Sequence, residues 1–323
     1  MNIQVLRRPT SLVVAALFLL TLAISTILPI KQASAVADIC TWTGTTSSLW
    51  SVATNWSCSV DGAVIPETGD ALVFPAGASN LIMNNDLGAL TYTTVTTTGD
   101  GYTFGGNAIN LSNYWQFASA NNTVTANINY ANAGSTSMTI SPGATGNIIN
   151  GNIDLALTAG GDMNTSVDED INHNGAITGS TDICQQGTET NNWISSATNA
   201  STFTASGGVS IDSGAFKCRN ANCFGNNANS VETNTTGAIQ FNNVSMTVAN
   251  SITFNSSTSP QLNQMPGSTT LSGTININST GTLYTQSGGT VIGSGSWVLN
   301  ANANSLGSSS ATSLLDITGV VSG

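Results

Sequence analysis

The residues that could carry out chemistry are concentrated in residues 154–232. This segment contains more than half of the sixteen acidic residues, the only histidine, His173, and the basic residues Lys217 and Arg219. By contrast, Thr233–Leu315 contains no Asp, Glu, Lys, Arg or His. A segment without ionisable side chains supplies no general acid or base. Any acid–base or metal chemistry is therefore predicted to lie in residues 154–232.

One run in this segment matches the first part of a calcium-binding loop. Asp170–Ile177 reads D-I-N-H-N-G-A-I, with oxygen-bearing side chains at positions 1, 3 and 5 and glycine at position 6. Position 12, where a bidentate carboxylate is expected, is Thr181. The sequence predicts Ca²⁺ as the cofactor, and the alternative is a solvated Asn/Asp turn. The candidate metal ligands are Asp168, Asp170, Asn172, Asn174 and Asp182.

The ionisable residues of the chain can be compared with those that three kinds of enzyme need. A β-helical polysaccharide lyase would need Lys217 or Arg219 as its base. A glycoside hydrolase needs two carboxylates about 5–10 Å apart, whereas neighbouring acids in one turn, such as those at 168–170, point in different directions. A Ser-His-Asp site would depend on His173. No catalytic residues are therefore predicted, and a polysaccharide hydrolase or lyase is the alternative.

The five cysteines predict disulfides, because an exported protein folds in an oxidising compartment. The simplest pairing is Cys40–Cys58 and Cys218–Cys223, which leaves Cys184 over. Pairing of Cys184 with Cys218 or Cys223 is the alternative. Zinc is disfavoured because the chain has a single histidine and the cysteine spacings match no zinc motif.

Residues 1–37 are typical of a signal peptide that directs export through the Sec route. Arg7 and Arg8 precede an apolar run, Leu12–Leu28, and two overlapping A-x-A sites end at Ala35 and Ala37. Cleavage would give a chain beginning at Val36 or Asp38, and an uncleaved membrane anchor is the alternative. Either way the body is expected outside the cytoplasm. After the leader all sixteen acidic residues remain against two basic ones, which argues against nucleic acid as a partner.

The rest of the chain has the pattern of half-buried strands. Apolar residues alternate with Asn, Ser and Thr, as in Ile252/Phe254 and Ile275/Ile277, and turn residues recur between the runs. This predicts an all-β fold, either a right-handed β-helix (solenoid) or a β-sandwich array. The β-helix is favoured because stacked asparagines can form ladders along parallel coils. The asparagines concerned are Asn107, Asn110, Asn127, Asn129, Asn147 and Asn150.

The N-terminal part of the body carries a distinctive motif order: W-x-G from Trp42, LWS around Trp50, NWS around Trp56, P-x-x-GD from Pro66, then an apolar strand. This order resembles the opening module of secreted bacterial β-solenoid surface proteins, of the adhesin or autotransporter-passenger kind. Trp42, Trp50 and Trp56 are predicted to cap the first rung of the stack, and an exposed sugar-stacking platform is the alternative.

The predicted organisation is a signal peptide (1–37), an N-terminal cap module (38–74), a first solenoid segment (75–153), an acidic cysteine-containing insertion (154–232) and a second solenoid segment (233–323), which lacks the pattern of a terminal cap and could be truncated. The predicted function is a secreted, non-catalytic cell-surface or extracellular structural or adhesive protein. Its predicted partners are glycans or cell-surface components, without nucleic acid and without membrane contact beyond the signal segment. An inert envelope stalk is the further alternative.

Overall fold

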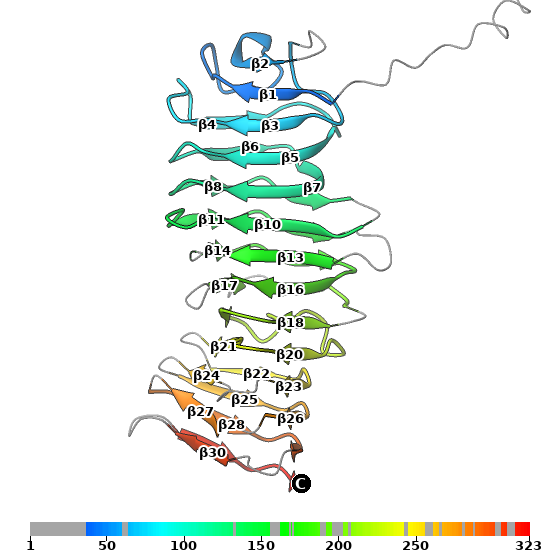
Figure 1. Ribbon diagram of the computed structural model, residues 1–323, viewed down its shortest axis with the longest axis vertical. Helices are drawn as coiled ribbons and strands as arrows, with labels where there is room; N and C mark the ends of the chain where they lie inside the picture. Colours follow the sequence, from blue (N-terminus) through cyan, green and yellow to red (C-terminus); the bar gives the residue numbers. More distant parts are fainter. Residues whose placement is uncertain are drawn as a thin grey trace, which may run out of the picture. The chain divides into compact units, whose positions relative to one another are not determined.

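The computed structural model describes residues 37–59, 64–131, 134–155, 162–167, 169, 171–187, 192–195, 203–205, 208–241, 245–255, 261–264, 267–279, 282–286, 288–300, 305–308 and 314–323. In these residues the chain is nearly all β-strand, with one short 3-10 helix, η1 (Ala53–Asn55). Strands from successive passes of the chain lie above one another in a parallel β-solenoid of about 9 turns (Figure 1). The predicted all-β solenoid is confirmed.

The strands belong to three sheets, in which most strands pair with the strand one coil before and one coil after. The largest sheet contains β1 (Ile39–Trp42), β2 (Trp56–Cys58), β3 (Ala71–Phe74), β5 (Thr91–Thr97), β7 (Ile109–Phe117), β9 (Ile128–Tyr130), β10 (Thr136–Ile140), β12 (Ile153–Leu155), β13 (Asp162–Val167), β15 (Ile177–Gly179), β16 (Asp182–Gln186), β18 (Val209–Ile211), β20 (Val231–Thr233), β23 (Ile252–Phe254), β26 (Ile275–Ile277), β29 (Trp297–Leu299) and β32 (Val321–Ser322).

The second sheet contains β4 (Ile82–Asn85), β6 (Thr103–Gly106), β8 (Thr123–Val124), β11 (Asn147–Ile149), β14 (Ile171–His173), β17 (Asn192–Ser195), β19 (Ala215–Cys218), β21 (Ala238–Phe241), β24 (Gln261–Gln264), β27 (Thr282–Gln286) and β30 (Ser305–Ser308). The third contains β22 (Met246–Val248), β25 (Ser268–Leu271), β28 (Thr290–Gly293) and β31 (Leu314–Ile317). Both sheets are parallel ladders, as the pairing of β21 with β24 and of β25 with β28 shows.

Coil length varies along the stack. Side-chain hydrogen bonds between stacked asparagines span 19 residues for Asn129 and Asn110 but 25 residues for Asn122 and Asn147. The inward position is nevertheless kept from coil to coil: Ile252 lies opposite Ile275, and both of their strands alternate buried and half-buried residues. Turns therefore absorb the length differences, which is why the sequence shows no fixed repeat.

The N-terminal end of the solenoid is closed by aromatic side chains. Trp42 and Trp50 are fully buried and Trp56 is nearly so. The ring of Trp56 lies edge-on to both, at centroid distances of 4.9 Å and 5.6 Å, and Phe74 of β3 packs 5.7 Å from Trp50. The predicted tryptophan-rich cap is confirmed. Because these rings are buried, they do not form an exposed sugar-stacking platform.

The middle segment, predicted as an insertion, contributes strands to the same ladders. β13 pairs with β10 of the preceding coil, and β18 pairs with β20 of the following one. Described residues outside the named strands also connect parts of these coils: Ser180 bridges to Thr204, and the amide of Asn226 donates to the carbonyl of Phe203 at 3.0 Å. The excess of charge in residues 154–232 is thus carried by coils of the solenoid.

Candidate functional site

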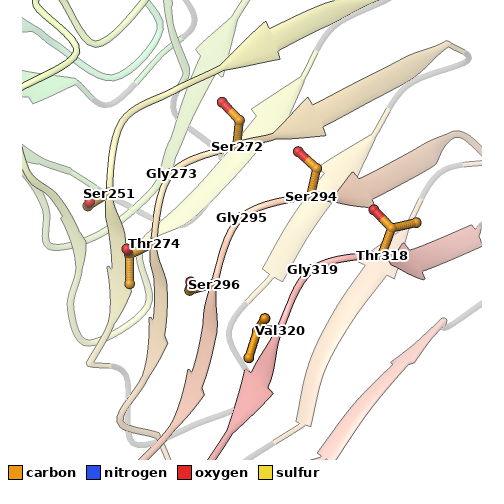
Figure 2. Close-up of a pocket in the computed structure, with 10 residues that line it drawn as sticks. All are labelled: Ser251, Ser272, Gly273, Thr274, Ser294, Gly295, Ser296, Thr318, Gly319 and Val320. Carbon is orange, nitrogen blue, oxygen red and sulfur yellow. The ribbon is translucent and has the colours of Figure 1, made fainter.

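A groove runs along one corner of the C-terminal coils (Figure 2). It is formed where β25 turns into β26, β28 into β29 and β31 into β32, and it has a volume of about 630 Å³. Its lining consists of small and mostly hydroxyl-bearing residues: Ser251, Ser272, Gly273, Thr274, Ser294, Gly295, Ser296, Thr318, Gly319 and Val320. The lining includes no ionisable side chain, so the groove offers hydrogen bonds but no acid, base or nucleophile activated by one.

Glycines make this corner possible. A Cβ on Gly273 would lie 2.2 Å from the carbonyl oxygen of Asn250, and one on Gly295 would lie 1.9 Å from that of Gly273. One on Gly319 would lie 1.8 Å from the carbonyl oxygen of Gly295. No side chain fits at such distances. Successive coils therefore approach closely here, and the column of glycines forms the floor of the groove.

Hydroxyl groups form the rim of the groove at the same place in successive coils. Figure 2 shows the side chains of Ser272, Ser294 and Thr318 side by side, each directly before a floor glycine. The hydroxyls of Ser272 and Ser294 make long hydrogen bonds, of 3.4 Å, to carbonyl oxygens of the coil before. Each retains lone pairs that can accept from a ligand. The rim of the groove thus offers neutral hydrogen-bonding groups and no charge.

A column of asparagines follows the last residue of successive strands in the largest sheet. Asn300 donates from Nδ2 to Oδ1 of Asn278 at 2.8 Å, and Asn278 donates to Asn255 at 2.8 Å. Asn255 donates to Asn234 at 3.2 Å, and Asn234 donates to Oδ1 of Asp212 at 2.9 Å. These amide groups therefore all donate in the same direction, and the column ends at a carboxylate that accepts without needing to donate.

Asp212 terminates this column and holds a low pKa. Partial burial pushes its pKa up, but hydrogen bonds from four side chains outweigh the burial and keep the pKa below its ordinary value. The donors are Asn234, Ser210, Cys184 and Gln186. The carboxylate is therefore ionised under physiological conditions and occupied by its donors, which is a structural arrangement and does not resemble a poised catalytic acid.

Cys184 lies beside this carboxylate. Its Sγ donates to Oδ2 of Asp212 at 3.4 Å, and burial together with the charge of Asp212 raises the pKa of the thiol. A protonated thiol is a weak nucleophile and a weak metal ligand. Both predicted disulfides, Cys40–Cys58 and Cys218–Cys223, are present, and Cys184 is the free cysteine.

Those candidate calcium ligands that the structure describes lie at different places in the coils. Asn172 is in β14, Asn174 follows at the corner and donates to Oδ1 of Asn150 at 2.8 Å, and Asp182 is in β16 of the largest sheet. Asp168 and Asp170 lie outside the described residues. The calcium site therefore stays a prediction. Among the residues that the structure describes, the grouping of metal-ligand side chains within reach of one another is that of Asp38, Cys40 and Cys58.

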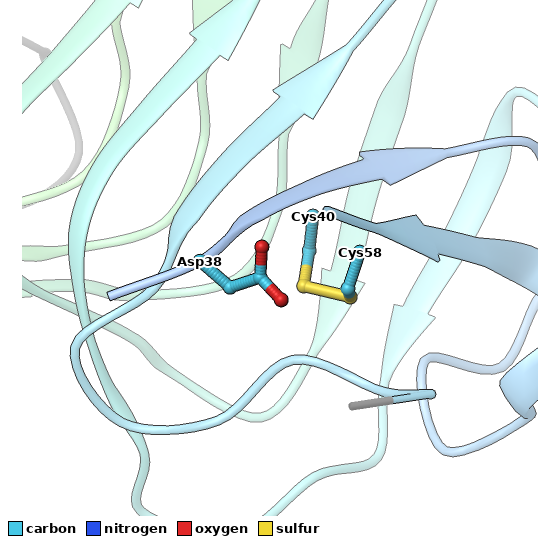
Figure 3. A group of neighbouring side chains, drawn as sticks. All are labelled: Asp38, Cys40 and Cys58. Atoms are coloured by element: carbon cyan, nitrogen blue, oxygen red, sulfur yellow. A yellow bond between two sulfur atoms is a disulfide. The ribbon is translucent and has the colours of Figure 1, made fainter. Parts of the chain in front are cut away.

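That grouping belongs to the N-terminal cap (Figure 3). The two sulfur atoms are joined in a disulfide, so neither is a thiolate that could bind a metal. The carboxylate of Asp38 accepts from the backbone amide and the hydroxyl of Ser59, at 2.6 Å and 2.7 Å. These contacts fix the first strand to the chain that crosses over it.

His173, on which a Ser-His-Asp site would depend, points into the core. It is fully buried in β14, and burial lowers its pKa to about 4, although a hydrogen bond with the backbone of Gly151 acts in the opposite direction. The imidazole is therefore neutral at physiological pH. A substrate at the surface does not reach a ring in this position.

Lys217 and Arg219 lie at the disulfide-closed loop of the middle coils. Lys217 is in β19, paired with Ile194 of the preceding coil and Gln240 of the following one, and both basic side chains are half-buried. The loop beyond them places Phe224 against Phe216, with ring centroids 5.1 Å apart. The positive charges thus flank a packed loop on the second sheet.

Comparison with protein-family models, with curated proteins and with solved structures found no match to this chain. Within the part of the chain that the structure describes, no helix has the length and apolar character that crossing a bilayer requires.

Because the comparisons found no match, the interpretation of the groove depends on its own geometry. A sequence signal for it exists: Ser272-Gly-Thr, Ser294-Gly-Ser and Thr318-Gly-Val each precede a strand of the largest sheet.

Proposed function

We propose that this protein is a secreted, non-catalytic structural or adhesive component of the cell surface or extracellular matrix, and that its C-terminal groove binds an uncharged polysaccharide chain. The observation that carries the proposal is the corner groove, in which hydroxyl side chains recur at the spacing of the coils over a floor of glycines. A linear glycan also repeats hydroxyl groups along its length, so several contacts can form along one chain.

Surface composition supports the same proposal. Most of the groove lining belongs to Thr233–Leu315, which contains no ionisable residue. Such a surface binds polyanions and polycations poorly and retains its solubility through neutral hydrogen-bonding groups. Export through the Sec route, predicted from residues 1–37, and the resemblance of the N-terminal module to adhesin-like surface proteins point to the same location.

The test is binding of the purified mature protein to an array of neutral and charged polysaccharides and to cell surfaces. We expect binding to uncharged glycans with no release of reducing ends or unsaturated sugars. The groove variant Ser272→Ala/Ser294→Ala/Thr318→Val is expected to lose at least about tenfold in affinity, since each lost hydrogen bond contributes about 0.5–1.5 kcal/mol.

A matched control removes three half-buried hydroxyls from the largest sheet, away from the groove: Thr94→Val/Ser137→Ala/Thr139→Val. This control should bind like the wild type. Equal losses in both variants would argue against the groove. Release of sugar products would instead support a polysaccharide hydrolase or lyase, and silence in every assay would support an inert stalk.

Calcium is the cofactor that we propose, on the sequence of Asp170–Ile177. Calorimetry of the mature chain with CaCl₂ should give a saturable heat in the range of extracellular modules, with a Kd of about 0.1–1 mM. The variant Asp170→Asn should abolish this heat, whereas Asp100→Asn, far from the loop in sequence, should keep it. An absence of heat at millimolar CaCl₂ would end the proposal.

A further inference from the structure

Two acidic side chains are buried side by side at the start of the first strand. Asp38 and Asp70 are each only 1% exposed. The backbone nitrogen of Asp38 donates to Oδ1 of Asp70 at 2.9 Å, and that of Glu67 donates to Oδ2 of Asp70 at 2.7 Å. Asp38 accepts its own hydrogen bonds from Ile39 and Ser59. Both acids are therefore held by backbone donors.

Once the leader is removed, the sequence around Asp70 supplies no basic side chain, whereas the uncleaved chain carries Lys31 seven residues before Asp38. Residues 38–172 contain no Lys, Arg or His, and Lys217 and Arg219 belong to coils well beyond the cap. The strands that surround the pair, β1, β3 and β5, come from residues 39–97. Burial of carboxylates is costly unless a positive charge accompanies them. The sequence of the cap, residues 38–74, thus provides the buried carboxylate of Asp70 and a backbone nitrogen that donates to it, but no basic side chain.

A processed N-terminus would supply that charge at the nitrogen that already donates. We propose that the exported protein is cleaved between Ala37 and Asp38, and that the new α-ammonium of Asp38 pairs with the Asp70 carboxylate inside the cap. In this step a signal peptidase adds water to the carbonyl carbon of Ala37. The peptide bond breaks, Ala37 leaves with a carboxylate, and the nitrogen of Asp38 becomes an ammonium group.

The boundary of burial coincides with this bond. Ala37 is exposed, whereas Asp38 is buried, so the chain enters the fold at the Ala37–Asp38 peptide. In the sequence, Ala35-Val36-Ala37 is an A-x-A site that ends at the same bond. Cleavage at the other site, after Ala35, would leave Val36 and Ala37 in front of Asp38, and its nitrogen would stay a neutral amide. The inference depends on the export predicted from the leader and is independent of glycan binding.

The first experiment is N-terminal sequencing and intact-mass analysis of the protein exported by cells that express the full chain with its leader. The expected first residue is Asp38. A chain that begins at Val36, or one that keeps the leader, overturns the proposal. Because neither readout involves a glycan, failure here is distinct from failure of the proposed adhesive function.

The second experiment tests the ion pair. Mature chains that begin at Asp38 or at Val36 are compared, each with Asp70 or with the substitution Asp70→Asn. With Asp70 present, the two-residue extension should lower Tm by roughly 2–4 °C, a shift typical of losing one moderate interaction. In the Asp70→Asn background the extension should change Tm little. The substituted side chain is neutral, so it gains little when the nitrogen of Asp38 is a charged ammonium instead of a peptide N–H.

Asp86→Asn serves as the control, because Asp86 is exposed and binds Ser51 rather than the start of the first strand. In this background the extension should cost as much as in the wild type. If Asp70→Asn does not fold, the wild-type and Asp86→Asn pairs still give the cost of the extension. An extension without effect on Tm in both of them would overturn the ion pair.

Discussion

The two ends of the solenoid have the same backbone plan but different side chains. In the N-terminal coils the core is aromatic: Phe74, Phe104 and Trp115 follow one another with ring centroids 4.9 Å and 5.2 Å apart. In the C-terminal coils the core is mainly aliphatic, with Ile252 and Ile275 in register. The polar contacts differ as well, since the N-terminal cap uses the buried carboxylates of Asp38 and Asp70 as hydrogen-bond acceptors and the C-terminal coils use asparagine amides and hydroxyls.

This difference indicates how each region obtains its stability. Aromatic rings bury large areas in one place and suit an end that must be closed. In a region where each coil mainly contacts its neighbours, the free energy of unfolding is close to the sum of the stabilities of the single coils and of the interfaces between them. Such a region can be stabilised by many small contacts repeated from coil to coil. The neutral coils can therefore present a uniform surface, and the capped coils protect it from end-to-end association.

The largest effect is expected from the cap. Trp50→Ala removes a fully buried ring that contacts Trp56, Phe74 and Tyr92, and should lower the free energy of unfolding by about 3–5 kcal/mol. Ile275→Val in the aliphatic core should cost about 0.5–1.5 kcal/mol. Urea unfolding followed by circular dichroism measures both. Equal losses would show that the two cores do not differ as described.

Acid should affect the middle coils, which contain His173 and Asp212, but not the neutral coils that follow them. The pKa of His173 is about 4 in the folded chain and about 6.5 in an unfolded chain. At pH values between about 4 and about 6.5 the imidazole is therefore protonated in the unfolded chain and neutral in the folded one. The free energy of unfolding therefore falls as pH falls from about 6.5 to 4, by about 3 kcal/mol in total. Below this window Asp212, whose folded pKa is low, adds a further loss as it is protonated.

Hydrogen exchange measured by mass spectrometry at pH values of about 7 and about 4.5 would show which coils lose stability as His173 becomes easier to protonate. After correction for the intrinsic pH dependence of exchange, protection should fall around β14 and stay constant in β23–β29. In His173→Met the difference between the two pH values around β14 should shrink. A uniform loss along the chain would contradict the assignment to His173.

The groove floor should not tolerate a methyl group. Gly295→Ala would place a Cβ 1.9 Å from the carbonyl oxygen of Gly273, so the coils must separate, at a cost of about 1–3 kcal/mol. Gly88→Ala is the matched control in the N-terminal coils, because a Cβ there meets nothing within 4 Å. Thermal melts of both variants would test this, and a neutral Gly295→Ala would show that the corner is more open than the structure indicates.

The smallest effect is expected from the amide column. Asn278→Ala removes the donor to Asn255 and the acceptor for Asn300, both at exposed positions. It should lower the free energy of unfolding by about 0.5–1.5 kcal/mol. Asn300→Ala removes one bond of the column and should cost less. If the two variants lose the same amount in urea melts, the column is not the unit that stabilises these coils.

Part of this organisation could be predicted from local patterns. The simplest pairing of the cysteines, Cys40–Cys58 and Cys218–Cys223, is the one that the structure has, although the sequence leaves the pairing of Cys184 open, and the cap is predicted from three tryptophans near the first strand. The predicted asparagine ladder includes Asn110 and Asn129, which are hydrogen-bonded at 2.9 Å. The longer column from Asn234 to Asn300 could not be predicted, because it depends on which turn positions coincide after coils of unequal length.

The acids illustrate the same limit. Asp38 and Asp70 are 32 residues apart in sequence, and nothing local indicates that the nitrogen of one lies against the carboxylate of the other. The predicted calcium ligands span residues 168–182: the structure places Asn172 and Asp182 on strands of different sheets, while Asp168 and Asp170 lie outside the described residues, so the site stays a prediction. Separation along the chain therefore does not by itself decide which side chains meet in a solenoid.

The sequence by itself determined that this chain forms strands covered with neutral amides and hydroxyls, and it predicts their export, because period-two alternation, composition and the leader are properties of short windows. Only the tertiary structure decided which glycines form a groove, which asparagines form a column and which acids meet in the cap. The physical reason is that these groupings depend on register between neighbouring coils, and register is set by inward side chains and turns whose spacing varies, for example from 19 residues between Ile109 and Ile128 to 27 residues between Thr136 and Met163.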